Sequence, residues 1–258
     1  MRRAGTAAVL LAILLAALFF LPRNGVALLM AIITAIGGHE WARICGLAAT
    51  SARAYAAAIV VMFGLGMMLD DKTAVFLLAA LFWVLAAPLW MWRGVKAEHR
   101  SALLATGFVV LVPAALAMVV LRPGEALTIL AVAWIADTGA YFAGRRWGRR
   151  KLAPAISPGK TWEGAAGGLV GAVAYAMILA LFLAGAQASR MAVFLGAATL
   201  LVMVSIVGDL FESAAKRQAG LKDSGALLPG HGGMLDRIDS VCAILPVGAA
   251  LVLLKVSA

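Results

Sequence analysis

Residues 193–209 read VFLGAATLLVMVSIVGD, a run that holds no charged residue until it ends in an aspartate. A second run, LTILAVAWIAD over residues 127–137, has the same form. A helix needs roughly 20 predominantly apolar residues to cross the hydrocarbon core of a bilayer. The whole chain of 258 residues shares this character, because 64% of its residues are hydrophobic and 13% are charged. Such a composition predicts a polytopic membrane protein and excludes an intrinsically disordered chain.

Nine stretches are long and apolar enough to predict an all-α polytopic integral membrane protein with about nine transmembrane helices. They begin near Ala7, Val26, Ala54, Thr73, Ala102, Ala126, Gly164, Met191 and Ile238. The second is the weakest, because its apolar run over residues 26–36 ends at Gly37-Gly38. The first resembles a cleavable signal peptide, although residues 22–24 suit a short turn between two spans better.

The distribution of basic residues predicts the orientation. With the N-terminus in the cytoplasm, the predicted inside segments hold most of the 22 lysines and arginines, which places the C-terminus outside. The net charge of +10 then indicates cytoplasmic loops and anionic lipid headgroups rather than nucleic acid. The two cysteines, Cys45 and Cys242, lie in or beside apolar segments, so no disulfide framework is expected.

We expect two regions of different roles. Residues 1–123 form N-terminal transmembrane helices that act as a scaffold of unclear role. Residues 124–258 form a catalytic transmembrane region with two cytoplasmic loops, 144–163 and 212–237, which are the longest polar segments of the chain. Chemistry is therefore expected on the cytoplasmic side.

Two aspartates stand out because each follows a long apolar run. An ionisable group at membrane depth costs roughly 2.5–3.5 kcal/mol, so Asp137 and Asp209 are expected to face a cavity or a partner. On a helix, Asp209 shares a face with Ser213 and Lys216, and Glu212 falls in the same arc. The acidic residues of the first half lie in short loops or at helix ends by this interpretation: Glu40, Asp70, Asp71, Glu98 and Glu125.

The segment Lys222–Gly233 cannot form a regular helix, because Pro229 restricts the backbone and three glycines surround His231. Such a loop presents backbone N–H groups to an anion. It leads into Asp236 and Asp239, which would share one helix face. Oxygen ligands suit Mg²⁺, and neighbouring cations take phosphate charge, so the segment predicts a metal–phosphate site. The alternative is a solvated loop followed by a helix cap.

The sequence GKT at residues 159–161 does not form a P-loop, because Pro154 stands where that motif requires glycine. What remains is Lys160 between two hydroxyl residues, Ser157 and Thr161, before a helix that carries Glu163 in its first turn. We interpret this as an anion contact. The basic run 145–151 is expected to meet lipid phosphates.

Covalent catalysis is not favoured. The histidines His39, His99 and His231 form no triad, and no serine has the setting of a nucleophile elbow. Metal-assisted phosphoryl or nucleotidyl transfer fits the residues better.

The C-terminal third resembles the signature of the phosphatidate cytidylyltransferase (CDP-diacylglycerol synthase) family. The resemblance runs without a gap from Ser213-Ala-Ala-Lys216-Arg217 through Lys222-Asp223 and residues 229–233 to Asp236-Arg237-Ile238-Asp239. The upstream residues that also look like that family are Asp137-Thr138, Tyr141-Phe142, Gly144-Arg145, Gly148, Ser157-Pro158, Lys160-Thr161, Glu163-Gly164 and Gly208-Asp209.

The resemblance implies that CTP and phosphatidate react to give CDP-diacylglycerol and pyrophosphate, with Mg²⁺ and room for a second cation. A phosphatidate oxygen would attack the α-phosphorus directly. By this analogy Asp209 and Asp236 are the leading metal ligands. The catalytic residues are Asp209, Asp236, Lys216, Arg217, Lys222 and Asp223. The substrate-binding residues are Asp137, Arg145, Ser157, Lys160, Thr161, Glu163, Ser213, His231, Gly232, Gly233, Arg237 and Asp239.

The expected partners are CTP, phosphatidate and membrane lipid, without nucleic acid. The small residues of 164–171 leave room for a homodimer. The compact chain favours a prokaryotic inner membrane, with the site facing the cytoplasm. One alternative is a related CTP-dependent enzyme for another lipid, such as a polyprenol kinase or an archaeol-type cytidylyltransferase. A transporter is less favoured, because the polar residues concentrate in one half of the chain.

Overall fold

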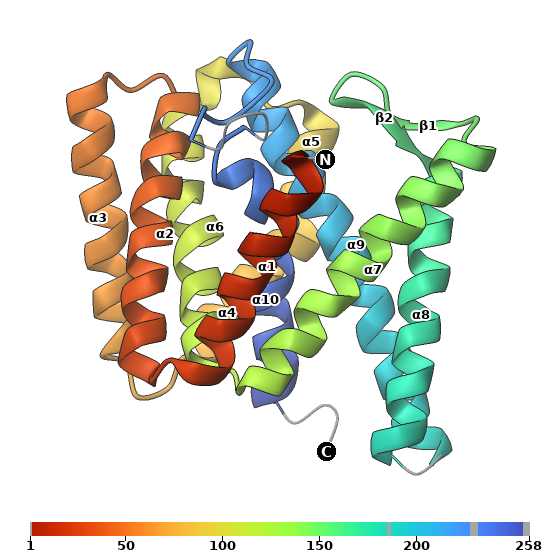
Figure 1. Cartoon of the computed structure of the whole chain (residues 1–258). Coiled ribbons are helices and arrows are strands. Elements are labelled where there is room, and N and C mark those ends of the chain that lie inside the picture. Colours follow the sequence, from red (N-terminus) through yellow and green to blue (C-terminus); the bar gives the residue numbers. More distant parts are fainter. Residues whose placement is uncertain (1, 185–186, 228–231, 255–258) are drawn as a thin grey trace.

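The computed structural model describes residues 2–184, 187–227 and 232–254, and it is almost entirely helical (Figure 1). The first half contains α1 (Arg2–Phe20), α2 (Arg23–Ile44), α3 (Ala49–Met67), α4 (Thr73–Leu81), the π-helical turn η1 (Phe82–Ala86), α5 (Ala87–Arg93), the 3-10 turn η2 (Ala97–His99) and α6 (Arg100–Val120). The second half contains α7 (Pro123–Trp147), β1 (Lys151–Ala153), β2 (Ser157–Thr161), α8 (Trp162–Ala184), α9 (Ala188–Gln218) and α10 (Leu235–Leu253). The predicted all-α polytopic membrane fold is confirmed.

Seven helical segments of the described chain are long and apolar enough to cross a membrane. They are Arg23–Ile44, Ala49–Met67, Thr73–Arg93, Ala97–Val120, Pro123–Trp147, Trp162–Phe182 and Ser189–Gln218. The apolar stretch Leu11–Phe20 of α1 is shorter, and α10 carries three charged residues near its start. The number of nine spans and the orientation of the termini stay predictions.

The second span is longer than its apolar run suggested, because α2 continues through Gly37-Gly38 to Ile44. These glycines are packing positions. A Cβ on Gly37 would lie 3.1 Å from Leu111 Cδ2, and one on Gly38 would lie 3.3 Å from the Cα of Ala56. The absence of side chains therefore lets α2 approach α6 and α3 closely without ending the helix.

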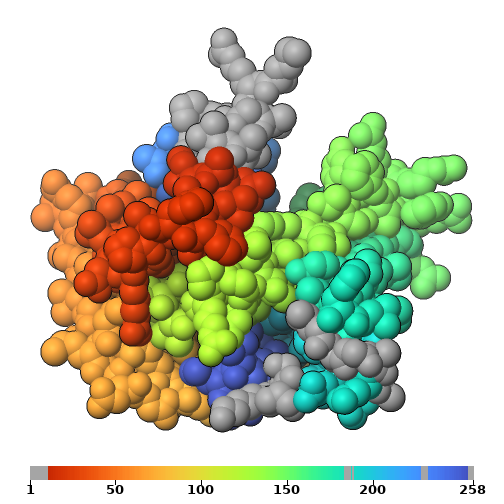
Figure 2. All heavy atoms as spheres, turned by 60° about the horizontal axis from the view of Figure 1, so that its bottom comes forward, coloured from red at the N-terminus to blue at the C-terminus, as the bar shows by residue number. Residues whose placement is uncertain are grey.

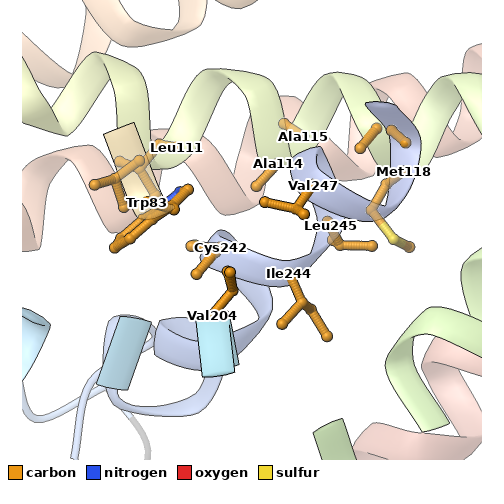
Figure 3. Packing of buried hydrophobic residues seen from close by; sticks show 14 of the residues in the cluster. Trp83, Leu111, Ala114, Ala115, Met118, Val204, Cys242, Ile244, Leu245 and Val247 are labelled. Carbon is orange, nitrogen blue, oxygen red and sulfur yellow. The ribbon is translucent and has the colours of Figure 1, made fainter. Parts of the chain in front are cut away.

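Helix α10 forms the centre of the core. Residues 242–250 are all buried, and α10 packs against α9, α6, α4 and α7. Figure 3 shows Cys242 and Leu245 of α10 among side chains of neighbouring helices, including Ala114 of α6 and Val204 of α9. Figure 2 brings the bottom of Figure 1 forward, and there the blue atoms of α10 reach the surface in a small area between other helices. The start of α10, which carries Asp236 and Asp239, thus continues directly into a tightly packed core.

The small-residue face of α8 packs inside the chain. A Cβ on Gly167 would lie 2.2 Å from Ala143 Cβ, and one on Gly139 would lie 2.7 Å from the carbonyl oxygen of Gly167. Close approach of α7 and α8 therefore depends on glycine at these positions. The face that suggested a homodimer is used within this chain, and the homodimer itself stays a prediction.

A small antiparallel hairpin, which the sequence did not predict, joins α7 to α8. Lys151 of β1 pairs with Thr161 of β2. The carboxylate of Glu163 accepts hydrogen bonds from the backbone N–H groups of Arg149 (3.1 Å) and Arg150 (3.2 Å). Thr161 Oγ1 accepts one from Gly164 N (3.1 Å) and so caps α8. Figure 1 shows the hairpin at the same end of the molecule as the connection between α9 and α10.

Candidate functional site

The first element of the site is an ion pair between the hairpin and α9. Lys160 Nζ of β2 lies 2.6 Å from Asp209 Oδ2, and the two side chains are 27% and 30% exposed. Ser213 Oγ, one helical turn further along α9, donates to Asp209 Oδ1 over 3.3 Å. The hairpin thus positions the ammonium group of Lys160 beside Asp209, the aspartate that ends the apolar run of α9.

The second element is a buried ion-pair group between α9 and α10. Lys216 Nζ lies 2.5 Å from Asp236 Oδ1 and 3.3 Å from Glu212 Oε1, and all three side chains are at most 9% exposed. The predicted polar face of α9 is confirmed, since Asp209, Glu212, Ser213 and Lys216 make contacts along it. Removing one partner of such a buried pair is costly, because the other charge is left uncompensated.

The loop between α9 and α10 closes around the other oxygen of Asp236. Asp236 Oδ2 accepts hydrogen bonds from the backbone N–H groups of Ser224 and Gly233, both at 2.8 Å, and from the Ser224 hydroxyl at 3.0 Å. Gly232 has a φ of +81°, and a Cβ there would lie 2.4 Å from Asp236 Oδ2. The described part of this loop is not a regular helix, as predicted. His231 lies outside the described residues.

Four carboxylates gather where α9 crosses α10. Asp209 and Glu212 come from α9, and Asp236 and Asp239 come from α10. Asp239 is repelled electrostatically by Asp209, and Glu212 by both aspartates of α10. Neither carboxylate oxygen of the buried Glu212 has a hydrogen-bond partner in the part of the chain that is described. Two lysines, Lys160 and Lys216, make ion pairs with three of these four acidic side chains.

Gly208 sets the distance between the two helices that carry these carboxylates. A Cβ on Gly208 would lie 2.7 Å from Ala243 Cβ and 2.8 Å from the carbonyl oxygen of Asp239. No flexible side-chain end can yield at those two atoms, so α9 and α10 would have to separate.

We therefore expect Gly208→Ala to destabilise the fold by about 2 kcal/mol and to move Asp209 away from α10. Thermal unfolding in detergent measures the stability. Gly196→Ala is the matched control on the same helix, because a Cβ at Gly196 meets nothing within 4 Å. Equal unfolding temperatures for the two variants would show that the Gly208 contact is not needed.

A cavity of about 370 Å³ opens beside the Lys160–Asp209 pair. Its lining includes Asp137, Tyr141, Arg145 and Lys160. Arg145 donates to the Tyr141 hydroxyl over 3.1 Å, and the expectation that Asp137 faces a cavity is confirmed. Thr161 also lines this cavity, so the structure brings four of the predicted binding positions together around it, beside Asp209.

Other predicted site residues bind backbone carbonyl groups or lie outside the lining of this cavity. Arg217 donates to the carbonyl oxygens of Ile156 (3.3 Å) and Leu221 (3.1 Å), which ties the end of α9 to the hairpin. Asp223 lines a different cavity from Asp137. The remaining positions lie in the hairpin, in the loop and at the start of α10: the half-buried Ser157 and the exposed Lys222 and Arg237.

Glu40 is the residue that sequence reasoning missed. The expectation that it lies in a loop or at a helix end is wrong, because it lies within α2 and is 6% exposed. Its carboxylate accepts hydrogen bonds from Ser224 Oγ (3.0 Å) and from the backbone N–H groups of Met234 and Leu235 (both 2.9 Å). The free N–H groups at a helix start need such an acceptor, and negative charge there is favourable. The sequence did hold a signal for a buried role of Glu40, since this carboxylate stands two residues after the pair Gly37-Gly38 in a mostly apolar helix.

The fold and the site together define a polytopic integral membrane protein with a charged, partly buried site at one end of its helices. Residues 1–255 match the model of the cytidylyltransferase family, and the chain belongs to that family.

Several curated relatives are similar over long stretches. A phosphatidate cytidylyltransferase of Pseudomonas aeruginosa is 42% identical over 95% of this chain and 94% of its own length. One of Brucella suis is 38% identical over 80% of this chain and 76% of its own. One of Haemophilus influenzae is 50% identical over 46% of this chain and 42% of its own. The resemblance read from the sequence and the prediction of a nucleotidyltransferase are confirmed.

Proposed function

We propose that this protein makes CDP-diacylglycerol and pyrophosphate from CTP and phosphatidate for phospholipid biosynthesis. The names of its relatives support the reaction. The observation that carries the proposal is the Lys160–Asp209 ion pair beside a cavity, together with the buried Lys216–Asp236 pair between α9 and α10. Cations next to carboxylates suit a triphosphate and the metal that accompanies it.

The donor set fits Mg²⁺ bound jointly by protein and substrate. The described residues contain no group of three or more His, Cys, Asp or Glu side chains that would hold a metal by themselves. Mg²⁺ is usually bound by one or two carboxylates together with substrate phosphates, which matches Asp209 and Asp236. Glu212, whose buried carboxylate lacks hydrogen bonds to described residues, adds charge that attracts a cation. When bound, the ion would neutralise phosphate charge.

The reaction is a displacement at the α-phosphorus of CTP. A phosphatidate oxygen forms the new P–O bond, the bond to the bridging oxygen breaks, and pyrophosphate leaves with the electron pair. Negative charge grows on the leaving group, so fixed cations there lower the barrier. Lys160, which lines the cavity, would take this charge by exchanging its carboxylate contact for a phosphate oxygen, and the buried Lys216 would add positive charge from behind Asp236. The exposed Lys222 of the α9–α10 loop and Arg237 at the start of α10 would also bind phosphate groups.

Lys160→Ala is expected to raise the KM for CTP and to lower kcat, together by about a hundredfold in kcat/KM, because a cation for the phosphates is lost. Steady-state kinetics at varied CTP measure both constants. Arg190→Ala removes an exposed cation at the opposite end of α9 and is the control. Unchanged kcat and KM in Lys160→Ala would remove this lysine from the site.

We place the protein in a prokaryotic inner membrane, with the site facing the cytoplasm, where CTP is made. The bacterial sources of its relatives support this location. The basic residues of 145–151 flank the hairpin at the site end, as expected for the cytoplasmic side.

Product analysis separates this function from the alternative enzymes. Purified protein would be supplied with CTP and Mg²⁺, and with either phosphatidate or a polyprenol. Mass spectrometry should find CDP-diacylglycerol with phosphatidate and no phosphorylated polyprenol. A phosphorylated polyprenol, without CDP-diacylglycerol, would identify a lipid kinase instead.

A further inference from the structure

A second and larger cavity, of about 1340 Å³, lies outside the site described above. It is bounded by α2, α3, the start of α6, the end of α9 and the first part of the α9–α10 loop. In Figure 1, α2 and α3 stand at the edge of the molecule opposite α8, so this cavity lies on the far side of the loop from the hairpin. Asp223 lines it and was predicted to be catalytic, but the proposed reaction does not explain the rest of this space.

Three arginines from three different segments converge on this cavity. Arg43 comes from the last turn of α2, Arg53 from the start of α3 and Arg100 from the start of α6, and all three side chains are exposed. Arg43 donates one hydrogen bond to the carbonyl oxygen of Leu47 (2.7 Å), and Arg100 donates one to that of Gly46 (3.2 Å). Each guanidinium has five N–H donors, so most remain available to a ligand.

Arg53 makes no ion pair or hydrogen bond with the described part of the chain. The half-buried His39 lines the same cavity. Three guanidinium groups with unused planar donors are suited to a phosphate group, which they can contact in a bidentate manner. The end of the cavity that these arginines line, called its mouth below, therefore has the positive charge and the donors that an anion needs.

Below this mouth the wall of the cavity is apolar. Ile36 of α2 and Val60 of α3 line it seven residues before Arg43 and seven after Arg53. A helix rises 1.5 Å per residue, so the apolar wall reaches roughly 10 Å deeper along both helices. Val61 and Leu65, on the next turns of α3, are large apolar side chains exposed on the outside of the protein. A free phosphate needs no such wall, whereas the acyl chains of a lipid do.

The acidic groups of this cavity do not cancel its positive mouth. Both oxygens of Glu40 already accept hydrogen bonds, from Ser224, Met234 and Leu235. Asp223 is exposed on the loop, so the lining holds three arginines against two carboxylates and keeps an excess of positive charge.

We propose that this cavity binds an anionic glycerophospholipid, with its phosphate at Arg43, Arg53 and Arg100 and its acyl chains along α2 and α3. The same loop forms one wall of this cavity and, through Ser224, holds Asp236 of the catalytic cluster. The bound lipid thus packs against the outer side of the loop that shapes the site.

The test uses phosphatidylglycerol with a photoreactive acyl chain, in phosphatidylcholine vesicles that contain the full-length protein. This lipid is a phosphodiester without a free phosphate monoester to attack CTP, so the readout does not depend on turnover. Peptide mapping should find adducts on residues 36–60. Each arginine near the membrane surface contributes a factor of about ten or less to the affinity for an anionic lipid. The triple variant R43Q/R53Q/R100Q should therefore bind the lipid about a hundredfold more weakly. Arg93→Gln, on an exposed arginine outside this cavity, should label like the wild type.

Three results would overturn the proposal: equal labelling of the triple variant, equal labelling by a phosphatidylcholine probe, or displacement of the probe by millimolar inorganic phosphate. The last would identify a site for soluble phosphate. Arg53→Gln alone, at a residue without partners in the described chain, gives a folded comparison if the triple variant unfolds. Because no CTP is used, failure here leaves the proposed reaction untouched.

Discussion

Replacing Asp209 with asparagine is expected to lower the rate of CDP-diacylglycerol formation by about a thousandfold, because it removes the charge that attracts the cation and orients Lys160. Asparagine keeps the shape of the side chain and still accepts a hydrogen bond from Ser213. The fold should therefore survive. The measurement is the initial rate with saturating CTP and phosphatidate, together with the unfolding temperature of the same preparation.

Asp70→Asn is the matched control for Asp209→Asn, since Asp70 lies exposed in the loop between α3 and α4. It should leave both the rate and the unfolding temperature unchanged. A fully active Asp209→Asn enzyme would contradict the role of Asp209 as a metal ligand. Asp236→Asn is expected to be inactive as well, but also less stable, because Asp236 binds the loop through Ser224 and Gly233.

Replacing Glu40 with alanine is expected to have the largest effect on stability, a loss of roughly 4 kcal/mol in the free energy of unfolding. The change removes the acceptor for the backbone N–H groups of Met234 and Leu235, whereas Ser224 Oγ keeps Asp236 Oδ2 as an acceptor. Each buried donor left without a partner costs about 1–3 kcal/mol. The variant would also release the loop from α2, so that activity falls even below the unfolding temperature. Thermal unfolding in detergent and the initial rate measure the two effects.

Glu98→Ala is the control for Glu40→Ala, because Glu98 is an exposed glutamate in η2. Glu40→Gln is a second, milder variant, which keeps one acceptor oxygen and should retain part of the stability. If Glu40→Ala unfolded at the wild-type temperature with a wild-type rate, the carboxylate would have no part in holding the loop.

The helical fold was predictable because the bilayer imposes simple requirements on composition and length. Runs such as residues 193–208 are too apolar for anything except membrane helices, and period-3.6 spacing placed Asp209, Ser213 and Lys216 on one face. The irregular α9–α10 loop was predictable from its glycines and proline. Local rules of this kind decide each of these features, so one sequence suffices to find them.

The missed features depend on contacts between segments far apart in the sequence. Glu40 reads as an ordinary polar residue until α2 is placed beside the start of α10, 194 residues further along the chain. The β1–β2 hairpin is too short to show an alternating pattern. The glycines of α8 read as a surface for another molecule, whereas they meet α7 of the same chain.

The first half of the chain therefore also contacts the segments that carry the predicted site residues. Besides the contacts of Glu40, Gln218 at the end of α9 donates to the carbonyl oxygen of Ile44 over 3.2 Å. Residues 1–123, expected to be a scaffold of unclear role, fix the loop and the start of α10 from one side. The hairpin fixes α9 from the other, through Lys160 and Arg217.

Nucleotidyl transfer from CTP to phosphatidate is tested most directly by the release of pyrophosphate from the purified, detergent-solubilised protein. We expect one pyrophosphate for each CDP-diacylglycerol, only with both substrates present, and loss of release when Mg²⁺ is chelated. A folded protein that released no pyrophosphate, or that released CDP in its place, would contradict it.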